Sequence, residues 1–121
     1  SAVSAFAAQL DPTLDELADV KTAVSEAVTN SIIHGYENRI GKIYLTCAKE
    51  KKQIQIEVVD YGKGIEDVLK AKEPFYTTRP ELERSGMGFA FMEAFMDDVE
   101  VASAPGQGTT VRMMKQFGTG A

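Results

Sequence analysis

Three glycine-centred segments follow one acidic helix in this chain, and each lies where a predicted strand or helix begins or ends. A single glycine motif usually marks only a turn. Several in a fixed order indicate a place where the backbone must approach a ligand closely. Glu26 to His34 lie on the helix, and the three glycine-centred segments are residues 60–64, 85–88 and 106–109. This pattern predicts a nucleotide site.

The helix that carries the acidic segment begins at a capping box. Thr13 precedes Glu16 by three residues, a spacing at which both side chains satisfy backbone N–H groups at a helix start. We expect this helix to run to about Gly35, after an N-terminal helical segment that ends at residues 11–12. Apolar residues spaced by three and four predict its core face. They are Leu17, Val20, Val24, Val28 and Ile32.

Alternating apolar and polar residues predict four strands in two hairpins. Residues 43–47 and 53–60 alternate with period two, and residues 49–52 form the polar turn between them. Residues 99–102 and 109–117 form the second hairpin.

The remaining segments complete the fold class. Residues 88–96 are a strongly apolar helix, residues 65–72 a short helix, and residues 73–84 a loop whose length indicates a function. This order of elements predicts an α+β fold, a two-layer α/β sandwich with helices on one face of a sheet.

Composition bounds the class of protein. The 121 residues fit a single domain, residues 1–121, and a net charge of −5 argues against a broad surface for nucleic acid or anionic membrane. No apolar run approaches the roughly 18 residues of a membrane span, and the chain start lacks the basic segment of a signal peptide. A lone Cys47 fits a reducing cytoplasm, and one Cys with one His excludes a structural zinc site.

Glu26, Asn30 and His34 are four residues apart, so they form one stripe along the helix. A solvated polar face is the ordinary interpretation of such a stripe. Beside glycine motifs, however, a carboxylate base and an amide that can ligate magnesium are what phosphoryl transfer requires. His34 can contact phosphate or cap the C-terminal end of the helix, and both interpretations stay open.

The first and third glycine motifs offer groups that can recognise a base. Asp60 ends a strand, with Gly62 and Gly64 behind it. Its carboxylate can accept a hydrogen bond from an adenine amino group, and the glycines let the base approach the backbone. Gly108 and Thr109, in the last hairpin, can place a hydroxyl beneath the adenine. An Asp-rich turn and a plain hairpin turn are the alternatives.

The second glycine motif, residues 85–88, opens an apolar helix. Its backbone N–H groups and the helix N-terminus favour an anion there. Arg84, directly before it, can pair with a terminal phosphate. A flexible hinge and a surface arginine are the alternatives.

In this order, the motifs resemble the boxes of the GHKL superfamily of ATPases and kinases. Glu26-x-x-x-Asn30 is similar to the N-box, and residues 60–64, 86–88 and 106–109 are similar to the three glycine boxes. Longer stretches resemble, within that superfamily, the anti-sigma-F serine kinases of spore-forming bacteria. These stretches are residues 11–17, 25–36, 77–89 and 95–99.

This resemblance implies a fold, an activity and partners. The fold would be the GHKL (Bergerat) ATP-binding type, with a mixed β-sheet and helices on one face. The activity would be that of an ATP-dependent protein serine kinase that also sequesters a sporulation sigma factor as a homodimer. Its protein substrate would be an anti-anti-sigma factor, phosphorylated on serine. Members of the family have a further strand before the position of Ser1, and we expect that strand to be absent here.

The resemblance also implies a role for each site residue. Glu26 would be the general base, Asn30 the ligand of a Mg²⁺ ion on the phosphates of ATP or ADP, and Asp60 the acceptor for the adenine amino group. Residues 73–85 would form a lid over the nucleotide. The other expected nucleotide contacts are His34, Gly62, Gly64, Thr77, Thr78, Arg84, Ser85, Gly86, Met87, Gly88, Gly108 and Thr109.

Four alternative functions compete with this one. A histidine kinase needs a phosphoacceptor histidine on a dimerisation helix, and the chain's single His34 lies in the N-box helix. ATPases of the gyrase or mismatch-repair kind need a further domain with a catalytic lysine. A stress-response anti-sigma kinase and a nucleotide-gated anti-sigma module without transfer stay open. Glu26 favours transfer, because a module that only binds nucleotide needs no base there.

Overall fold

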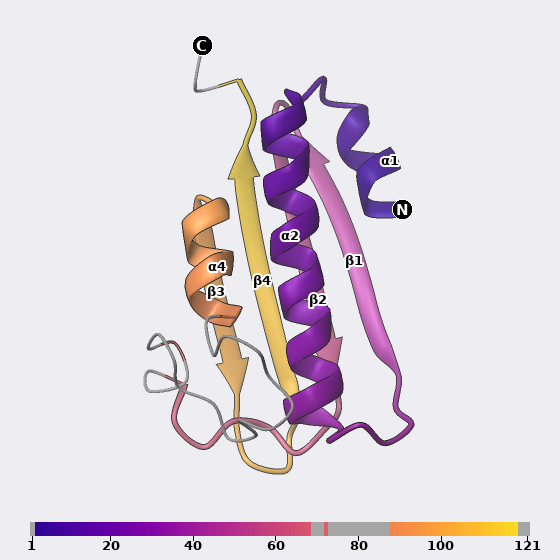
Figure 1. The fold of residues 1–121 in the computed structure, drawn as a ribbon, viewed down its shortest axis with the longest axis vertical. Helices are drawn as coiled ribbons and strands as arrows, with labels where there is room; N and C mark the ends of the chain where they lie inside the picture. The colour runs from indigo at the N-terminus through magenta and orange to yellow at the C-terminus, as the bar shows by residue number, and fades with distance from the viewer. Residues whose placement is uncertain (1, 69–71, 73–87, 119–121) are drawn as a thin grey trace.

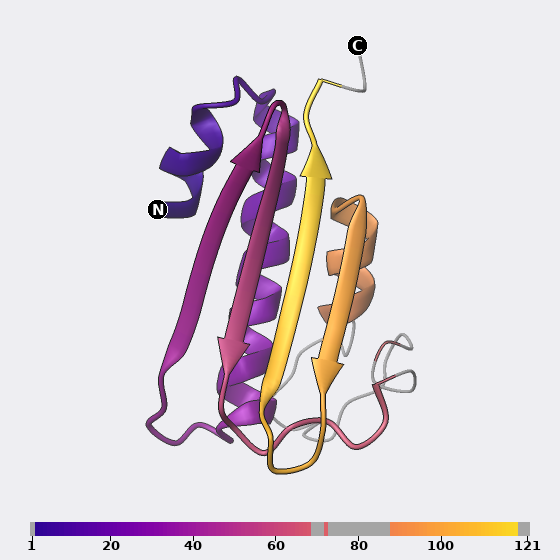
Figure 2. The ribbon, with the colours of Figure 1, turned by 180° about the vertical axis from the view of Figure 1, so that it is seen from behind.

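A four-stranded antiparallel sheet with helices on one face makes up the described part of the chain, residues 2–68, 72 and 88–118, in a computed structural model (Figure 1). The strand order is β1-β2-β4-β3. The opposite face of the sheet carries no helix among these residues (Figure 2). The strands are β1 (Ile43–Glu50), β2 (Gln53–Asp60), β3 (Asp98–Ser103) and β4 (Thr109–Gln116).

All strand pairs in this sheet are antiparallel. β1 pairs with β2, β2 with β4, and β4 with β3. The α+β sandwich and its four strands are confirmed, whereas the mixed sheet is wrong for these strands. Residues 51–52 and 104–108 are short hairpin turns, which join only antiparallel strands and account for the β1–β2 and β3–β4 pairs. The β2–β4 pair in the middle of the sheet is also antiparallel.

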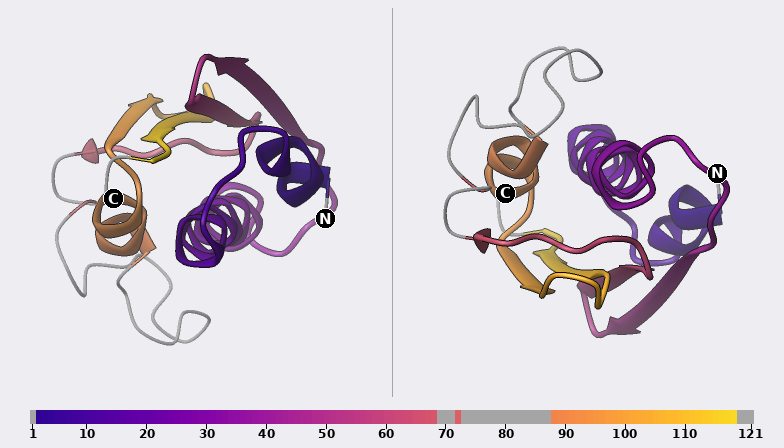
Figure 3. Two further views of the ribbon diagram at one scale, coloured as in Figure 1. Left: turned by 90° about the horizontal axis from the view of Figure 1, so that it is seen from above. Right: turned by 90° about the horizontal axis from the view of Figure 1, so that it is seen from below.

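The helical layer covers the sheet from one side, as the end-on views show (Figure 3). α2 lies over the middle of the sheet and α4 beside it, over β3. None of the described helices has the length and apolarity needed to cross a membrane. The helices are α1 (Ala2–Ala8), α2 (Leu14–Asn30), the π-helical turn η1 (Ser31–Gly35) and α4 (Gly88–Phe95).

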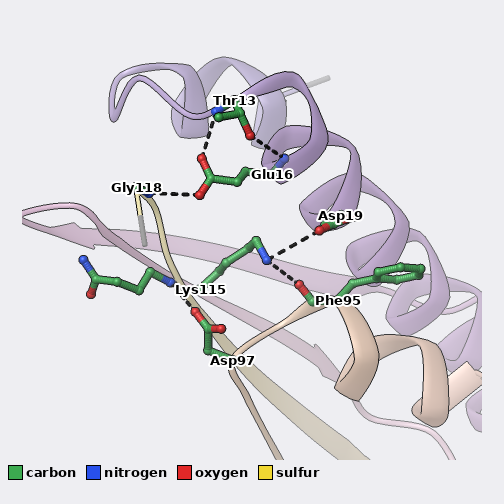
Figure 4. Close-up of polar contacts among 8 residues, drawn as sticks. Thr13, Glu16, Asp19, Phe95, Asp97, Lys115 and Gly118 are labelled. Atoms are coloured by element: carbon green, nitrogen blue, oxygen red, sulfur yellow. Dashed lines mark hydrogen bonds and ion pairs between the residues drawn. The ribbon is translucent and has the colours of Figure 1, made fainter. Parts of the chain in front are cut away.

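The start of α2 confirms the predicted capping box. The backbone N–H of Glu16 donates to Thr13 Oγ1 (3.0 Å), and the backbone N–H of Thr13 donates to Glu16 Oε1 (2.8 Å). The other oxygen of Glu16 accepts from the N–H of Gly118, beyond the end of β4, at 2.9 Å (Figure 4). This one carboxylate therefore fixes a helix start and the C-terminal end of the sheet.

Lys115 joins the same end of the two layers (Figure 4). Its Nζ donates to the carbonyl of Phe95 (2.7 Å), where α4 ends, and lies 3.6 Å from a carboxylate oxygen of Asp19 on α2. A cation at a helix C-terminus is favourable for the helix dipole. Strand β4 therefore holds both helices through one side chain.

The core face of α2 differs from the predicted stripe at one residue. Ile32 stays 42% exposed, so its assignment to the core is wrong. The fully buried positions include Ala23 and Ala27, and Ser31 continues their four-residue spacing at 2% exposure. Ile32 lies beyond the end of α2, in the π-helical turn η1, where the side-chain spacing of an α-helix no longer holds. The other stripe residues lie in or against the core: Leu17, Val20, Val24 and Val28.

Cys47 behaves as a packing residue. It is partly buried on β1 and packs against the core. Burial raises the pKa of its thiol, because a thiolate is poorly solvated there.

The short helix expected over residues 65–72 does not begin where the sequence predicted. Residues 65–67 are not helical, and Val68 is the first helical position. The backbone N–H of Ile65 instead donates to Ser103 Oγ at 2.7 Å. The chain is therefore tied to the edge of the sheet at this point. Residues 69–71 and the loop predicted at 73–84 lie outside the described residues.

Candidate functional site

Asp60 is the buried charged side chain at the end of β2. It is 2% exposed, and each carboxylate oxygen accepts one hydrogen bond. Ser31 Oγ donates to Oδ2 at 2.7 Å, and the backbone N–H of Gly62 donates to Oδ1 at 3.0 Å. Both donors are neutral, so the carboxylate is held in orientation without an opposite charge from them. Such a group keeps further acceptor capacity for a ligand.

The π-helical turn η1 brings the end of the N-box helix against this carboxylate. A Cβ atom on Gly35 would lie 3.0–3.1 Å from the three carboxyl atoms of Asp60. A Cβ atom on Gly62 would lie 2.2 Å from the carbonyl oxygen of Gly35, and the N–H of Lys63 donates to that carbonyl at 2.9 Å. The sequence pattern did not predict this π-helical turn. Single π-helical turns are frequent at functional sites.

The first and third glycine motifs also lie against each other. Gly64 has φ +78°, and a Cβ atom there would lie 2.0 Å from the carbonyl oxygen of Ala104. Gly108 has φ +77°, and its Cβ atom would lie 2.2 Å from the carbonyl oxygen of Asp60. Between them, the N–H of Gly106 donates to the carbonyl of Lys63 at 2.6 Å. Gly64 and Gly108 are thus required by close backbone approach as well as by turn geometry.

Thr109 lies directly opposite Asp60 in the β2–β4 pair and is 4% exposed. Its Oγ1 is 2.8 Å from Ser103 Oγ on the neighbouring strand β3. Ser103 also donates to the carbonyl of Gly108 at 2.9 Å. A row of polar side chains therefore crosses three strands at one end of the sheet.

Tyr36, directly after η1, fastens the surrounding loops. Its hydroxyl accepts from the backbone N–H of Tyr61 at 2.8 Å and donates to the carbonyl of Lys42. Gly41 has no side chain because a Cβ atom there would lie 2.5 Å from the Tyr36 ring. The residue after Asp60 is thereby tied to the end of the helix.

The structure therefore brings together part of the predicted site. Asp60, Gly62, Gly64, Gly108 and Thr109 converge at one end of the sheet, beside the C-terminal end of the N-box helix (Figure 1). Sequence reasoning missed Ser31, Gly35, Tyr36 and Ser103. Ser31, Gly35 and Tyr36 lie within the stretch 25–36 that resembles the family, and Ser103 directly follows the predicted strand 99–102.

The polar stripe of the N-box helix is partly buried. Glu26 lies within α2, Asn30 is its last residue, and His34 lies in η1. Gly88 is the first residue of α4. In the part of the chain that is described, no group of three or more His, Cys, Asp and Glu side chains could hold a metal ion. The remaining predicted contacts lie outside the described residues: Thr77, Thr78, Arg84, Ser85, Gly86 and Met87.

A sheet covered on one face by helices, with this glycine-lined site at one end, defines a class of protein. The family model of the histidine kinase-like ATPase domain matches residues 1–115. A solved structure titled as full-length ShkA in complex with AMPPNP matches with a TM-score of 0.64 at 22% identity. The match covers 84% of this chain and 22% of that one, and it supports the fold.

Curated relatives define the family more closely. The anti-sigma F factor of Thermoanaerobacter sp. (strain X514) is 62% identical over 117 residues, which are 97% of this chain and 82% of that protein. The anti-sigma F factor of Caldanaerobacter subterraneus subsp. tengcongensis is 63% identical over 96% of this chain and 81% of its own length. That of Clostridium acetobutylicum is 57% identical over 95% and 80%. The chain belongs to the anti-sigma F factor family.

Proposed function

We propose that this chain is an ATP-dependent protein serine kinase that also binds and sequesters a sporulation sigma factor. Its protein substrate is an anti-anti-sigma factor, which it phosphorylates on serine. The observation that carries the nucleotide part is the buried Asp60 carboxylate, oriented by Ser31 and Gly62 between closely packed glycines. Family membership supports the sigma factor as partner.

The residues around Asp60 fit the adenine end of ATP or ADP. A carboxylate that still has acceptor capacity can accept from the exocyclic amino group of adenine. Gly62 and Gly64 pack directly against the backbone of Gly35 and Ala104, which holds the first glycine motif beside Asp60. Thr109 lies opposite Asp60 and adds a hydroxyl to the same end of the sheet. The donor and acceptor chemistry is thus that of a purine pocket.

The stripe on the N-box helix would serve the phosphate end. Glu26 would accept the proton of the substrate serine hydroxyl as general base. Asn30 would contribute one amide oxygen to a Mg²⁺ ion whose other ligands come mainly from phosphates and water, a ligand set that this ion commonly takes. When bound, the ion would neutralise charge on the transferred phosphoryl group. His34 is proposed as a further nucleotide contact.

The segment from Glu73 to Ser85 is proposed as the lid over the nucleotide. Arg84 would contact the γ-phosphate, and Gly86 to Gly88 would contact the phosphate oxygens. The remaining nucleotide contacts would be Thr77, Thr78, Ser85 and Met87. This assignment follows from the family resemblance of residues 77–89. We further propose that the protein acts in the cytoplasm as a homodimer.

The experiment that tests this function is transfer of labelled γ-phosphate from Mg-ATP to an anti-anti-sigma protein. Glu26→Gln should lower transfer about 10²–10⁴-fold while ATP binding persists, because only the base is removed. Glu50→Gln is the matched control, because it makes the same chemical change at an exposed residue. Glu50 lies at the end of β1 that is remote from Asp60. Its transfer rate should equal that of the wild type.

Each of two results would overturn one part of the proposal. Normal phosphorylation by Glu26→Gln would show that Glu26 is not the base. Tight ATP binding by the wild type without any transfer would instead leave a nucleotide-gated anti-sigma module. Binding of ATP is measured by calorimetry in the same samples.

A further inference from the structure

The hydroxyl oxygen of Ser103 lies within hydrogen-bonding distance of three groups. The backbone N–H of Ile65 donates to its Oγ at 2.7 Å. The carbonyl of Gly108 lies 2.9 Å away, and the hydroxyl of Thr109 lies 2.8 Å away. The first partner can only donate and the second can only accept. Thr109 is the one partner that can do either.

A serine hydroxyl has one proton and two acceptor positions. Because the carbonyl of Gly108 can only accept, it takes the single proton of Ser103. The N–H of Ile65 uses one acceptor position, and Thr109 must donate to the other. The proton of Thr109 therefore points at Ser103, and its oxygen offers only lone pairs to any other partner.

The carboxylate of Asp60, on the adjacent strand, likewise offers only hydrogen-bond acceptors to a ligand. Its carboxylate already receives hydrogen bonds from Ser31 and Gly62, which matches an acceptor and not a donor. Asp60 and Thr109 are direct partners in the β2–β4 register, and both are buried. This end of the site therefore accepts hydrogen bonds from two neighbouring side chains and donates from neither.

We infer that Ser103 is a positioning residue that determines nucleotide specificity. It holds the Thr109 proton away from the ligand. As a result, the site selects a purine with a 6-amino group over a purine with a 6-carbonyl group. An amino group donates to acceptors, whereas a carbonyl oxygen would face two acceptors without a proton between them. This inference rests on the proposed nucleotide function. It adds to that function a residue on β3 whose effect passes through Thr109.

Ser103 also holds the segment after Gly64 through Ile65, so its loss has a structural consequence as well. A purely structural role would weaken the binding of every nucleotide by a similar factor. A role in polarity would change the ratio of two affinities. The decisive quantity is therefore the ratio of dissociation constants for Mg-ATP and Mg-ITP, because inosine carries a carbonyl oxygen where adenine carries the amino group.

We would measure both dissociation constants by calorimetry on the full chain and four variants. Ser103→Ala frees the Thr109 proton, and Ser103→Thr keeps the hydroxyl. Thr109→Val removes the acceptor while leaving Ser103 in place, which keeps the test valid if Ser103→Ala unfolds. Thr110→Val is the matched control, because strand alternation places its side chain on the opposite face of β4.

The wild type should bind Mg-ATP at least about 10-fold more tightly than Mg-ITP. Ser103→Ala and Thr109→Val should each reduce that preference at least about threefold, whereas Ser103→Thr and Thr110→Val should retain it. An unchanged ratio in both Ser103→Ala and Thr109→Val, with both affinities lowered equally, would overturn the inference. Equal wild-type affinities for the two nucleotides would overturn it while leaving phosphate transfer intact. Binding of neither nucleotide by the wild type would refute the proposed function itself.

Discussion

The two ends of the sheet carry polar clusters of opposite character. At the end shown in Figure 4, Lys115 on β4 pairs with Asp19 on α2 and donates to the carbonyl of Phe95 on α4, and Glu16 accepts from the backbone N–H of Gly118. At the other end, the buried charge of Asp60 is held by neutral donors, and hydroxyl groups dominate the row that continues to Ser103. Paired charges near a surface contribute modest stability. A buried carboxylate that keeps acceptor capacity is instead suited to recognition, which is the role that we propose for Asp60.

The largest effect that we expect from a substitution at the site end is that of Asp60→Asn. Its amide would have to turn an N–H₂ group toward the donors Ser31 and Gly62 or toward the base. We expect the dissociation constant for ATP to rise about 100-fold, since a charged hydrogen bond is lost and a donor faces a donor. Calorimetry with Mg-ATP measures this change.

A control for this substitution exists at the opposite end. Asp97 Oδ2 accepts from the backbone N–H of Gln116 at 2.6 Å (Figure 4), so Asp97→Asn makes the same chemical change there. It should leave ATP affinity within about twofold of the wild type. Equal losses from the two substitutions, or none from Asp60→Asn, would remove the functional distinction between the ends.

The second prediction compares two glycines of one hairpin. Gly106 and Gly108 have φ +75° and +77°, but a Cβ atom meets nothing within 4 Å at Gly106 and lies 2.2 Å from the Asp60 carbonyl oxygen at Gly108. Gly106→Ala should cost about 1 kcal/mol of folding free energy from strain alone. Gly108→Ala should cost about 1–3 kcal/mol more, from the added overpacking, and should also weaken ATP binding.

Urea unfolding measures the two free energies under the same conditions. If both alanine variants lose the same stability, the contact between the third glycine motif and Asp60 is not tight. That result would argue against a preformed pocket.

The smallest effect concerns Glu16, at the end that we assign to stability. A hydrogen bond from the Thr13 N–H holds the pKa of this carboxyl below its ordinary value of 4.5, against the opposing effect of desolvation, and the N–H of Gly118 adds to the lowering. A lowered folded-state pKa stabilises the fold fully above the unfolded value, and this contribution disappears as pH falls through the folded value.

Glu16→Gln should therefore lower the free energy of unfolding by about 0.5 kcal/mol at pH 7, and the difference should shrink as pH falls below 4.5. ATP affinity at pH 7 should stay unchanged. A difference that grows toward acid pH would show that the Glu16 charge does not stabilise the fold.

Much of the fold follows from local sequence signals. The capping box at Thr13 and Glu16 is formed as predicted, because both partners lie within one helical turn. Period-two alternation gave the four strands, with β1 extending beyond Cys47 to Glu50. Two expectations failed. Ile32 lies in the π-helical turn η1 instead of a continuing α-helix and is 42% exposed, and the N–H of Ile65 donates to Ser103 at the edge of the sheet instead of starting a helix.

The residues of the candidate site also fall into a group that local sequence signals predicted and a group that they did not. Asp60, Gly62, Gly64, Gly108 and Thr109 were predictable because a carboxylate or hydroxyl stood beside paired glycines at element ends. The residues that orient them were not. A serine has many ordinary positions in a sequence, and the partners of Ser31 and Ser103 at Asp60 and Ile65 lie 29 and 38 residues away. Their role exists only once the strands are paired.

The measurement that tests the central claim most directly is an amide NMR titration of the wild-type chain with Mg-ADP. The claim is that the end of the sheet around Asp60 binds nucleotide, while the end around Glu16 only stabilises the fold. The account predicts large shift changes at the amides of Gly62, Ile65 and Thr109, and none at Glu16 or Gly118. Saturable changes confined to Glu16 and Gly118, with Gly62 and Thr109 unmoved, would contradict it.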